Sequence, residues 1–567
     1  MSRAAVRLAG ALALSVSVAP GVAAQGGTWA LTNARIETVT RGVIERGTIV
    51  IRNGLIVAVG AGVEVPPDAR VLDLSGRTIM PGFIDLTSTL GLPAAAQPTG
   101  GPGGGAAAAA SAGQQGQGPR FVGLEPHRVV ADELRPQAAD VRAARDAGIT
   151  AALVAPNRGA FRGLSALVPL RDSVRREDVV RTPVGLHMGF QGTPGSYPAT
   201  LLGVIAYQRQ AFYDARRHGL LLERYRQNPR GMERPPNDPA LNALVPYARG
   251  EAPVFFAADR EDEIRRVLSI AREFGLDARI VGATEAFRVA PELAAWRRPV
   301  VISVDFPRAA QVTGWEYRYS MQRPLNDSAA ADSQVTRLVE GNAAAAMRAG
   351  VRFALAPGGL RPNEFLANVR RAVAAGLPRD SALAALTIRA AEIAGANQQL
   401  GSIEEGKIAN LVVARGDPLS SDSARIQMVF VDGIRYETTP PAAGAGARGA
   451  GAGGGGGRGA AAAGEMAQIA GTWITVTATP GGEVTSNMTL TQSGNSCSGQ
   501  LANEMFNAPI TSCEISGRTV TMTVTATIQG QTVTMTMRGE VDGDRMRGTI
   551  SAGEFGEMRF TGERRPQ

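Results

Sequence analysis

The sequence is poor in the residues that usually bind metals or build disulfide frameworks. Among 567 residues it has only three histidines and one lysine: His127, His187, His218 and Lys407. A catalytic zinc normally needs three convergent protein ligands, so the sequence leaves little material for one. The two cysteines, Cys497 and Cys513, allow at most one disulfide, and in an exported chain we expect them to be paired.

Long apolar runs and localised basic segments are also missing. Beyond the N-terminal region no apolar stretch is long enough to span a bilayer, so we expect no transmembrane segment. The net charge of +8 comes almost entirely from arginines scattered along polar faces. A nucleic-acid-binding protein would gather them in one stripe, so we expect no nucleic-acid partner. The hydrophobic content of 44% and the charged content of 19% are those of a globular protein.

The N-terminal 24 residues have the pattern of a secretory signal. Arg3 and Arg7 precede an apolar stretch that is too short to cross a membrane, and small residues ending at Ala24 form a cleavage site. We therefore expect residues 1–24 to be removed and the protein to be periplasmic or extracellular.

The chain is too long for one ordinary core, so we expect at least two domains. Two glycine- and alanine-rich stretches, residues 94–119 and 440–464, cannot bury enough apolar surface to fold into a packed core. We interpret the first as an insertion within a domain and the second as an interdomain linker.

Local patterns divide the region before residue 440 into segments of two kinds, β-rich segments and segments in which strands and helices alternate. Short β-runs occupy 27–80 and 400–437, with hairpin signals at Asn53-Gly54 and Asp432-Gly433. Buried strands and amphipathic helices alternate between them; the apolar positions of 261–274, for example, share one helical face that stops at Gly275. Such repeated units predict an α/β fold, a (β/α)8 TIM-like barrel over 81–399.

Several motifs carry a resemblance to the amidohydrolase superfamily. They are GLIVAVG at 54–60, PGFID at 81–85, ALT at 385–387 with AAE at 390–392, and LGSIEEGKIANLVV at 400–413. Members of that family have a metal-dependent barrel flanked by a β-sandwich made from both chain ends, and they hydrolyse non-peptide C–N bonds. The resemblance therefore implies a composite β-sandwich of residues 27–80 and 400–437 beside the barrel.

The family's metal ligands are not found at the matching positions. The resemblance implies His-x-His after the first strand, but Thr87 and Thr89 stand there, and hydroxyls are poor zinc ligands. Lys407 belongs to the 400–413 motif, so no lysine remains for the barrel. The later strands, 254–258, 280–282 and 353–357, lack the implied histidines and aspartate. We expect no metal and no other cofactor.

Other polar residues remain as pocket candidates. They are Asp85, Thr87, Thr89, His187, Glu285 and Asp305. Asp305 closes a strand at the barrel face where active sites gather, and two carboxylates can perform acid and base work without a metal. Asp259 is interpreted instead as a helix N-cap. We expect His127 in an exposed loop and His218 at a helix end beside Gly219.

Residues 465–567 form a different kind of domain. Threonines alternate with valines or methionines around Gln529-Gly530-Gln531, which is typical of antiparallel strands with one solvated face. The Gly471-Thr472-Trp473 opening weakly resembles a lipocalin-like barrel, a fold that can hold small ligands. A solid β-domain used for docking or stability is the alternative.

Three functions are consistent with these observations. The first is a degenerate, ligand-binding pseudoenzyme on an amidohydrolase-like fold, with a small molecule as its partner. The second is an unusual or metal-independent hydrolase acting on C–N bonds. The third is a structural or partner-binding protein.

Overall fold

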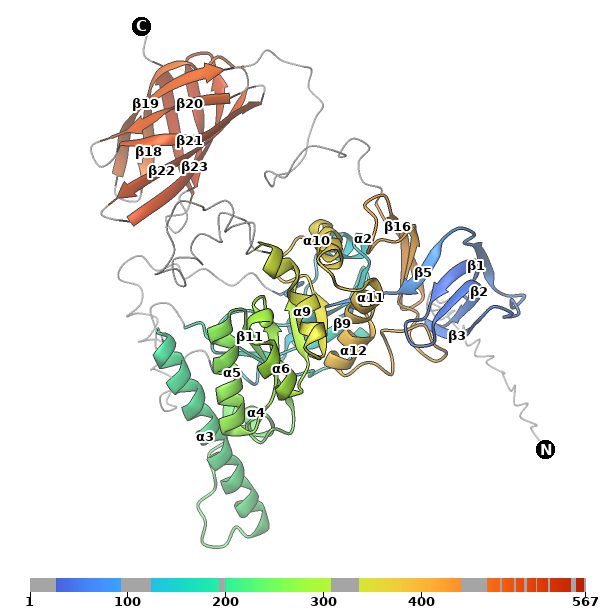
Figure 1. Cartoon of the computed structure of the whole chain (residues 1–567). Coiled ribbons are helices and arrows are strands. Elements are labelled where there is room, and N and C mark those ends of the chain that lie inside the picture. Colours follow the sequence, from blue (N-terminus) through green and yellow to red (C-terminus); the bar gives the residue numbers. More distant parts are fainter. Residues whose placement is uncertain are drawn as a thin grey trace, which may run out of the picture. The chain divides into compact units, whose positions relative to one another are not determined.

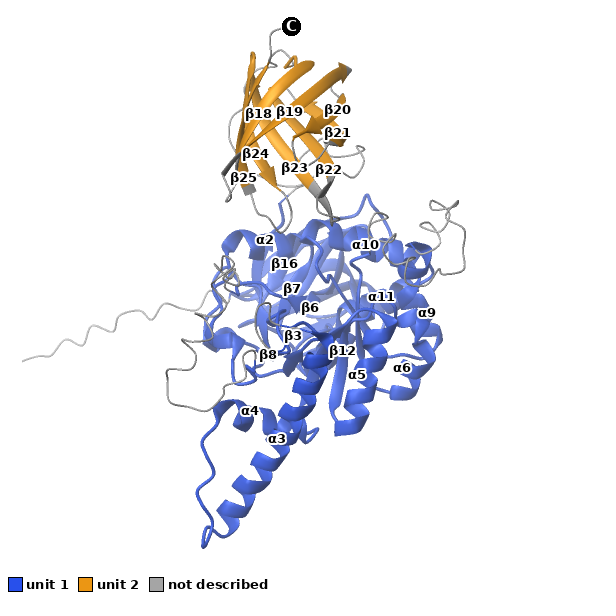
Figure 2. Ribbon diagram, turned by 90° about the vertical axis from the view of Figure 1, so that its left-hand side faces the viewer, with its two compact units in different colours: residues 1–446 blue, residues 447–567 orange. Residues whose placement is uncertain are grey.

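The computed structural model describes residues 27–92, 124–192, 198, 200–306 and 336–439, and then 467–479, 482–493, 496–503, 507–516, 518–528, 531–551 and 557–564. The signal segment 1–24 and the two low-complexity stretches, 94–119 and 440–464, lie outside these residues. The chain forms two compact units, residues 1–446 (unit 1) and 447–567 (unit 2) (Figure 2).

One eight-stranded sheet of unit 1 contains strands from both of its ends. Its order is β17-β16-β15-β5-β1-β2-β3, with β4 beside β1. β5 pairs antiparallel with β15, and the two sets of strands lie side by side (Figure 1). The strands are β1 (Trp29–Glu37), β2 (Val43–Arg52), β3 (Leu55–Gly60), β4 (Arg70–Asp73), β5 (Thr78–Pro81), β15 (Leu411–Arg415), β16 (Arg425–Val431) and β17 (Ile434–Glu437).

The two predicted hairpin turns in this sheet are confirmed. Asn53 and Gly54 join β2 to β3 with φ of 52° and 81°, and Asp432 and Gly433 join β16 to β17 with φ of 51° and 72°. Positive φ at both central positions suits the twist of paired strands. A Cβ on Gly54 would lie 2.8 Å from the carbonyl oxygen of Asp432, so the two turns also require glycine for their close approach.

The rest of unit 1 is an α/β domain with mostly parallel strands. One sheet has the order β6-β7-β9 and another β14-β13-β12-β11-β10-β8, in which β8 and β9 run antiparallel to their partners. The closure of these strands into an eight-stranded barrel remains a prediction. The strands are β6 (Phe83–Ser88), β7 (Ile149–Val154), β8 (Phe161–Leu164), β9 (Ala166–Pro169), β10 (Leu186–Met188), β11 (Pro253–Ala258), β12 (Asp277–Gly282), β13 (Val300–Ser303) and β14 (Phe353–Ala356).

Helices cover these strands, with α5 beside β11 and β12, and α6 beside α9 (Figure 1). The described helices of eight residues or more are α2 (Ala138–Asp146), α3 (Leu201–Gln227), α4 (Pro239–Ala248), α5 (Glu261–Phe274), α10 (Pro362–Ala374) and α11 (Arg379–Leu386). Shorter ones are η1 (Val130–Asp132), η2 (Arg176–Asp178), η3 (Ala286–Arg288), α6 (Ala290–Trp296), α9 (Asn342–Arg348) and α12 (Ile388–Ala394). None of the described helices is both long enough and apolar enough to cross a membrane.

Helix α5 confirms the prediction for residues 261–274. Its apolar face is buried, and Gly275 ends it in the left-handed conformation with φ of 57°. Ile264 and Phe274 of this face share a core with Phe256 of β11. The next residue along the strand, Phe255, belongs to a second core on the opposite face, because successive strand residues point to opposite sides.

Unit 2 is a closed antiparallel barrel, which confirms the all-β character predicted for its residues. Trp473, Met522, Met537 and Phe560 are among the apolar side chains buried in its core. Its strands are β18 (Gly471–Thr479), β19 (Gly482–Ser493), β20 (Ser496–Ala502), β21 (Asn507–Ser516), β22 (Thr519–Ile528), β23 (Gln531–Asp542), β24 (Arg545–Ser551) and β25 (Glu557–Arg564).

A disulfide joins β20 to β21 in this barrel. Cys497 and Cys513 are bonded, with their Cα atoms 5.0 Å apart. The pairing expected from the cysteine count is therefore present.

Candidate functional site

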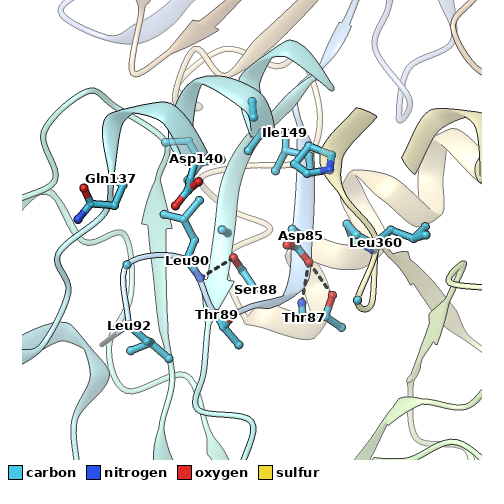
Figure 3. Close-up of a pocket in the computed structure, with 18 of the residues that line it drawn as sticks. Asp85, Thr87, Ser88, Thr89, Leu90, Leu92, Gln137, Asp140, Ile149 and Leu360 are labelled. Carbon is cyan, nitrogen blue, oxygen red and sulfur yellow. Dashed lines mark hydrogen bonds between the residues drawn. The ribbon is translucent and has the colours of Figure 1, made fainter. Parts of the chain in front are cut away.

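The end of strand β6 is closed by a hydrogen-bonded pair. The backbone N–H of Thr87 donates to Asp85 Oδ1 at 2.7 Å, and the Thr87 hydroxyl donates to the same oxygen at 2.8 Å (Figure 3). That hydroxyl also accepts a hydrogen bond from the backbone N–H of Gly358, at 3.0 Å. Thr87, at the position of an implied metal ligand, thus joins β6 to the segment that follows β14.

A cavity of about 810 Å³ adjoins this pair. It is bounded by the end of β6, by β7, by α2 and by the segment after β14 (Figure 3). Its lining includes three of the predicted candidates, Asp85, Thr87 and Thr89, whereas His187, Glu285 and Asp305 do not line it. Asp140 faces the cavity from α2, and Leu360 from the other side.

The electrostatics of Asp85 follow from its position in this wall. The side chain is half-buried, and desolvation raises the pKa of its carboxyl to about 6. Hydrogen bonds from Thr87 and Ser88 act in the opposite direction but do not cancel the burial effect. Asp85 therefore changes charge close to neutral pH.

His187 lies in a second group of polar residues, near the carboxyl ends of β10 to β13. It is 6% exposed and its ring stacks on Phe255, with the centroids 4.8 Å apart. Burial, helped by the neighbouring positive charge of Arg162, lowers the pKa of His187 to about 3, so the imidazole is neutral. Within the described residues its Nε2 atom has no hydrogen-bond partner.

Arg162, on β8, belongs to the same group and was missed by sequence reasoning. It is 7% exposed, and burial lowers the pKa of its guanidinium to about 10, although Asp259 favours the charged form. The guanidinium lies against Gly189, where a Cβ would be 2.1 Å from Nη2. The sequence feature that could have pointed to Arg162 is that it is the single charged residue in the stretch 160–170.

Asp259 does not cap α5, which corrects the interpretation from sequence. The first backbone N–H of that helix, at Glu261, donates instead to Glu285 Oε2 at 2.8 Å. One carboxylate oxygen of Glu285, a predicted pocket residue, therefore accepts a hydrogen bond from the first turn of α5. Asp259 lies over Gly282, where a Cβ would be 2.3 Å from its Oδ1 atom.

Asp259 and Asp305 interact electrostatically at the carboxyl ends of β11 and β13. Burial raises the pKa of Asp259 to about 6, and the negative charges of Glu263, Asp305 and Glu285 act in the same direction. Asp305 reaches toward the segment after β14, because a Cβ on Gly359 would lie 2.9 Å from its Oδ2 atom. The structure thus brings the carboxyl groups of Asp259 and Asp305 close together at the carboxyl ends of β11 and β13, in different surroundings.

The two remaining histidines lie elsewhere. His127 is exposed, as predicted, but the placement of His218 at a helix end is wrong. His218 lies inside α3, buried, with Nε2 at 2.8 Å from Asn242 Oδ1. Gly219 does not stop the helix; it lets α4 approach, since its Cβ would lie 3.0 Å from Val245 Cγ1.

The donor atoms do not fit the divalent metal that the family resemblance implies. No three His, Cys, Asp or Glu side chains converge to hold an ion in the described part of the chain. The Thr87 hydroxyl already donates one hydrogen bond to Asp85 and accepts one from Gly358. His187 lies beside the positively charged Arg162.

The comparisons with known proteins agree on the fold. Residues 328–435 match the model of the amidohydrolase family. The crystal structure of an amidohydrolase from Thermotoga maritima MSB8 is 24% identical, with a TM-score of 0.58, over 72% of this chain and 100% of that one. The predicted resemblance is confirmed. For unit 1 the likeness supports a mixed α/β fold with β-rich parts.

Other solved structures are more distant. A prolidase complexed with N-methylphosphonate-L-proline is 18% identical with a TM-score of 0.42, over 73% of this chain and 100% of that one. Molinate hydrolase is 18% identical with a TM-score of 0.41, over 72% and 95%. No curated protein is similar enough in sequence to be matched.

Proposed function

Because residues 328–435 match the amidohydrolase family and unit 1 has the fold of an amidohydrolase, we propose that this is an exported, amidohydrolase-like pseudoenzyme. It binds a small molecule in unit 1 without the family's metal centre. The bonded pair Cys497 and Cys513 supports export, since disulfides persist in oxidising compartments.

The observation that carries the proposal is the hydrogen bonding of Thr87. Its hydroxyl donates to Asp85 and accepts from Gly358, so a metal ion at that oxygen would have to displace contacts that join β6 to the segment after β14. A threonine hydroxyl is also a weak ligand for zinc compared with imidazole. The positive charge of Arg162 beside His187 disfavours a divalent cation in the second group as well.

Turnover and binding together test this function. Purified full-length protein is offered a panel of N-acyl amino acids, dipeptides and ureides, first with a chelator and then with added zinc. We expect thermal stabilisation by at least one compound with the chelator present, and no hydrolysis under either condition. Zinc-dependent hydrolysis would overturn the proposal.

A metal-independent hydrolase is the second candidate, and the carboxyl groups of Asp259 and Asp305 favour it. With the pKa of Asp259 near 6, one group of such a pair can be protonated while the other is ionised. This function predicts hydrolysis that persists in chelator and has a bell-shaped pH profile. Asp259→Asn and Asp305→Asn should each abolish it, while the exposed Asp380→Asn should retain it.

A further inference from the structure

Two buried side chains near the carboxyl ends of the strands have unused hydrogen-bonding groups. Within the described residues, the guanidinium of Arg162 makes one hydrogen bond, from Nε to the carbonyl oxygen of Gly159 at 3.3 Å. Among the described residues no carboxylate oxygen lies within 4.0 Å of it, and Asp259 acts on it from a longer distance. His187 Nε2 is likewise without a partner there.

The two side chains approach the same place from neighbouring strands. β8 pairs with β10, and Gly163 lies opposite His187. Gly189, two residues after His187, is the position against which the Arg162 guanidinium packs. The register shifts between His187 and Met188, so Arg162 has no direct partner on β10. Its guanidinium lies near enough to the imidazole for its charge to lower the pKa of His187.

Such an arrangement costs the free protein stability. A buried cation without a close counterion is unfavourable, and so is a buried imidazole nitrogen without a hydrogen bond. The cost is recovered when a group with two acceptor oxygens enters. The neutral imidazole, with its proton on Nε2, can donate to the same group without adding charge.

We propose that Arg162 and His187 form a subsite for the carboxylate of a small-molecule ligand. The proposal rests on the proposed function, in which unit 1 binds a small molecule. The planar guanidinium matches a carboxylate with two parallel N–H groups. A doubly charged phosphate is disfavoured, because within the described part of the chain Arg162 alone is found to place a positive charge beside His187, and the negative Asp259 lies close enough to interact with it.

Simple carboxylates are the probes. Full-length protein is titrated calorimetrically and melted with sodium acetate, sodium benzoate and N-acetylglycine, against sodium chloride at equal ionic strength. N-acetylglycinamide, which lacks only the negative charge, is the matched neutral compound. We expect at least one carboxylate to bind, and N-acetylglycinamide to bind about tenfold more weakly than N-acetylglycine or worse.

Two variants separate ligand binding from a structural role. Arg162→Met removes the buried charge, and His187→Phe keeps a ring on Phe255 but removes the N–H. Arg162→Met should melt at the same or a higher temperature without ligand and lose the response to carboxylates, and His187→Phe should weaken that response. Arg217→Gln, exposed on α3, should retain it.

Each alternative result has a separate meaning. No response of the natural protein to any of the three carboxylates would overturn the subsite, as would an Arg162→Met variant that is destabilised yet still responds. Zinc-dependent hydrolysis with a normal carboxylate response would overturn the proposed function and leave the subsite standing.

Discussion

Thr87 and Asp85, two residues apart on β6, form a closed hydrogen-bonded pair in which both the backbone N–H and the hydroxyl of Thr87 donate to the same carboxyl oxygen. The pair occupies the strand end where the family resemblance implies the first metal ligands. Its stability, its charge and its response to substitution can each be measured.

The first prediction concerns the charge of Asp85. Its pKa of about 6 in the folded protein lies above the ordinary value of 3.8, so ionisation of this group costs stability. The cost is absent below about pH 4 and complete above about pH 6. Asp85→Asn removes the charge and keeps an acceptor for Thr87, so at pH 7.5 it should be more stable than the natural protein by roughly 2 kcal/mol.

Urea unfolding of unit 1 at pH 7.5 and pH 4.5 checks this prediction. The gain from Asp85→Asn should shrink at the lower pH, because the natural carboxyl is then mostly protonated. Asp140→Asn, an exposed residue on the α2 side of the same cavity, is the control and should show no such gain. A loss of stability in Asp85→Asn at pH 7.5 would contradict the assignment.

The second prediction concerns restoration of the lost ligands. Thr87→His combined with Thr89→His places imidazoles at the family positions, but the other strands still lack ligands. We expect zinc affinity, measured by competition with a chromogenic chelator, to stay close to that of the natural protein. Stability should fall because the bonds from Thr87 to Asp85 and Gly358 are lost. Zinc-dependent hydrolysis in the double variant would reveal ligands that this account has missed.

The third prediction concerns the disulfide of unit 2. Cys497 and Cys513 are 16 residues apart, and closing a loop of that size stabilises a folded domain by about 3 kcal/mol in the chain-entropy account. Residues 465–567 expressed alone should melt at a markedly lower temperature when reduced or when carrying Cys497→Ala and Cys513→Ala. In the full chain, unit 1 should melt unchanged. A single transition shared by both units would contradict their independence.

The fourth prediction concerns the attachment of β1 to α11. Arg379 pairs with the buried carboxylate of Glu37 at 2.6 Å and with Asp417 at 3.0 Å. Arg379→Met should destabilise unit 1 by about 2 kcal/mol, because it leaves the buried carboxylate of Glu37 paired with Arg35 alone among the described residues and removes the arginine from Asp417. Arg371→Met, which breaks the more exposed pair with Glu340, should cost less than about 1 kcal/mol. Equal losses in urea unfolding would show that burial of Glu37 does not matter.

Local patterns in the sequence predicted much of the fold. Asn53-Gly54 and Asp432-Gly433 could be read as hairpins because only a few residue types tolerate positive φ at both turn positions. Helix α5 was predictable from the spacing of its apolar residues and from Gly275. In these cases the determining residues are neighbours in the chain.

The errors arose where distant residues decide the outcome. Gly219 looked like a helix stop, but it accommodates Val245 of another helix. Asp259 looked like the cap of α5, but the carboxylate that binds the helix start comes from Glu285. Arg162 carries no local signal beyond an arginine in a nonionic stretch, and only strand pairing brings it near His187. The roles of the predicted site residues stay predictions.

The metal content of the purified protein tests the central claim most directly. The protein, purified without chelators and analysed by inductively coupled plasma mass spectrometry, should contain far less than one zinc, manganese, iron or nickel ion per molecule. Dialysis against zinc followed by gel filtration should not change that result. One tightly held divalent ion per chain would contradict the account and show that a metal centre forms although Thr87 and Thr89 replace the family's first two histidines.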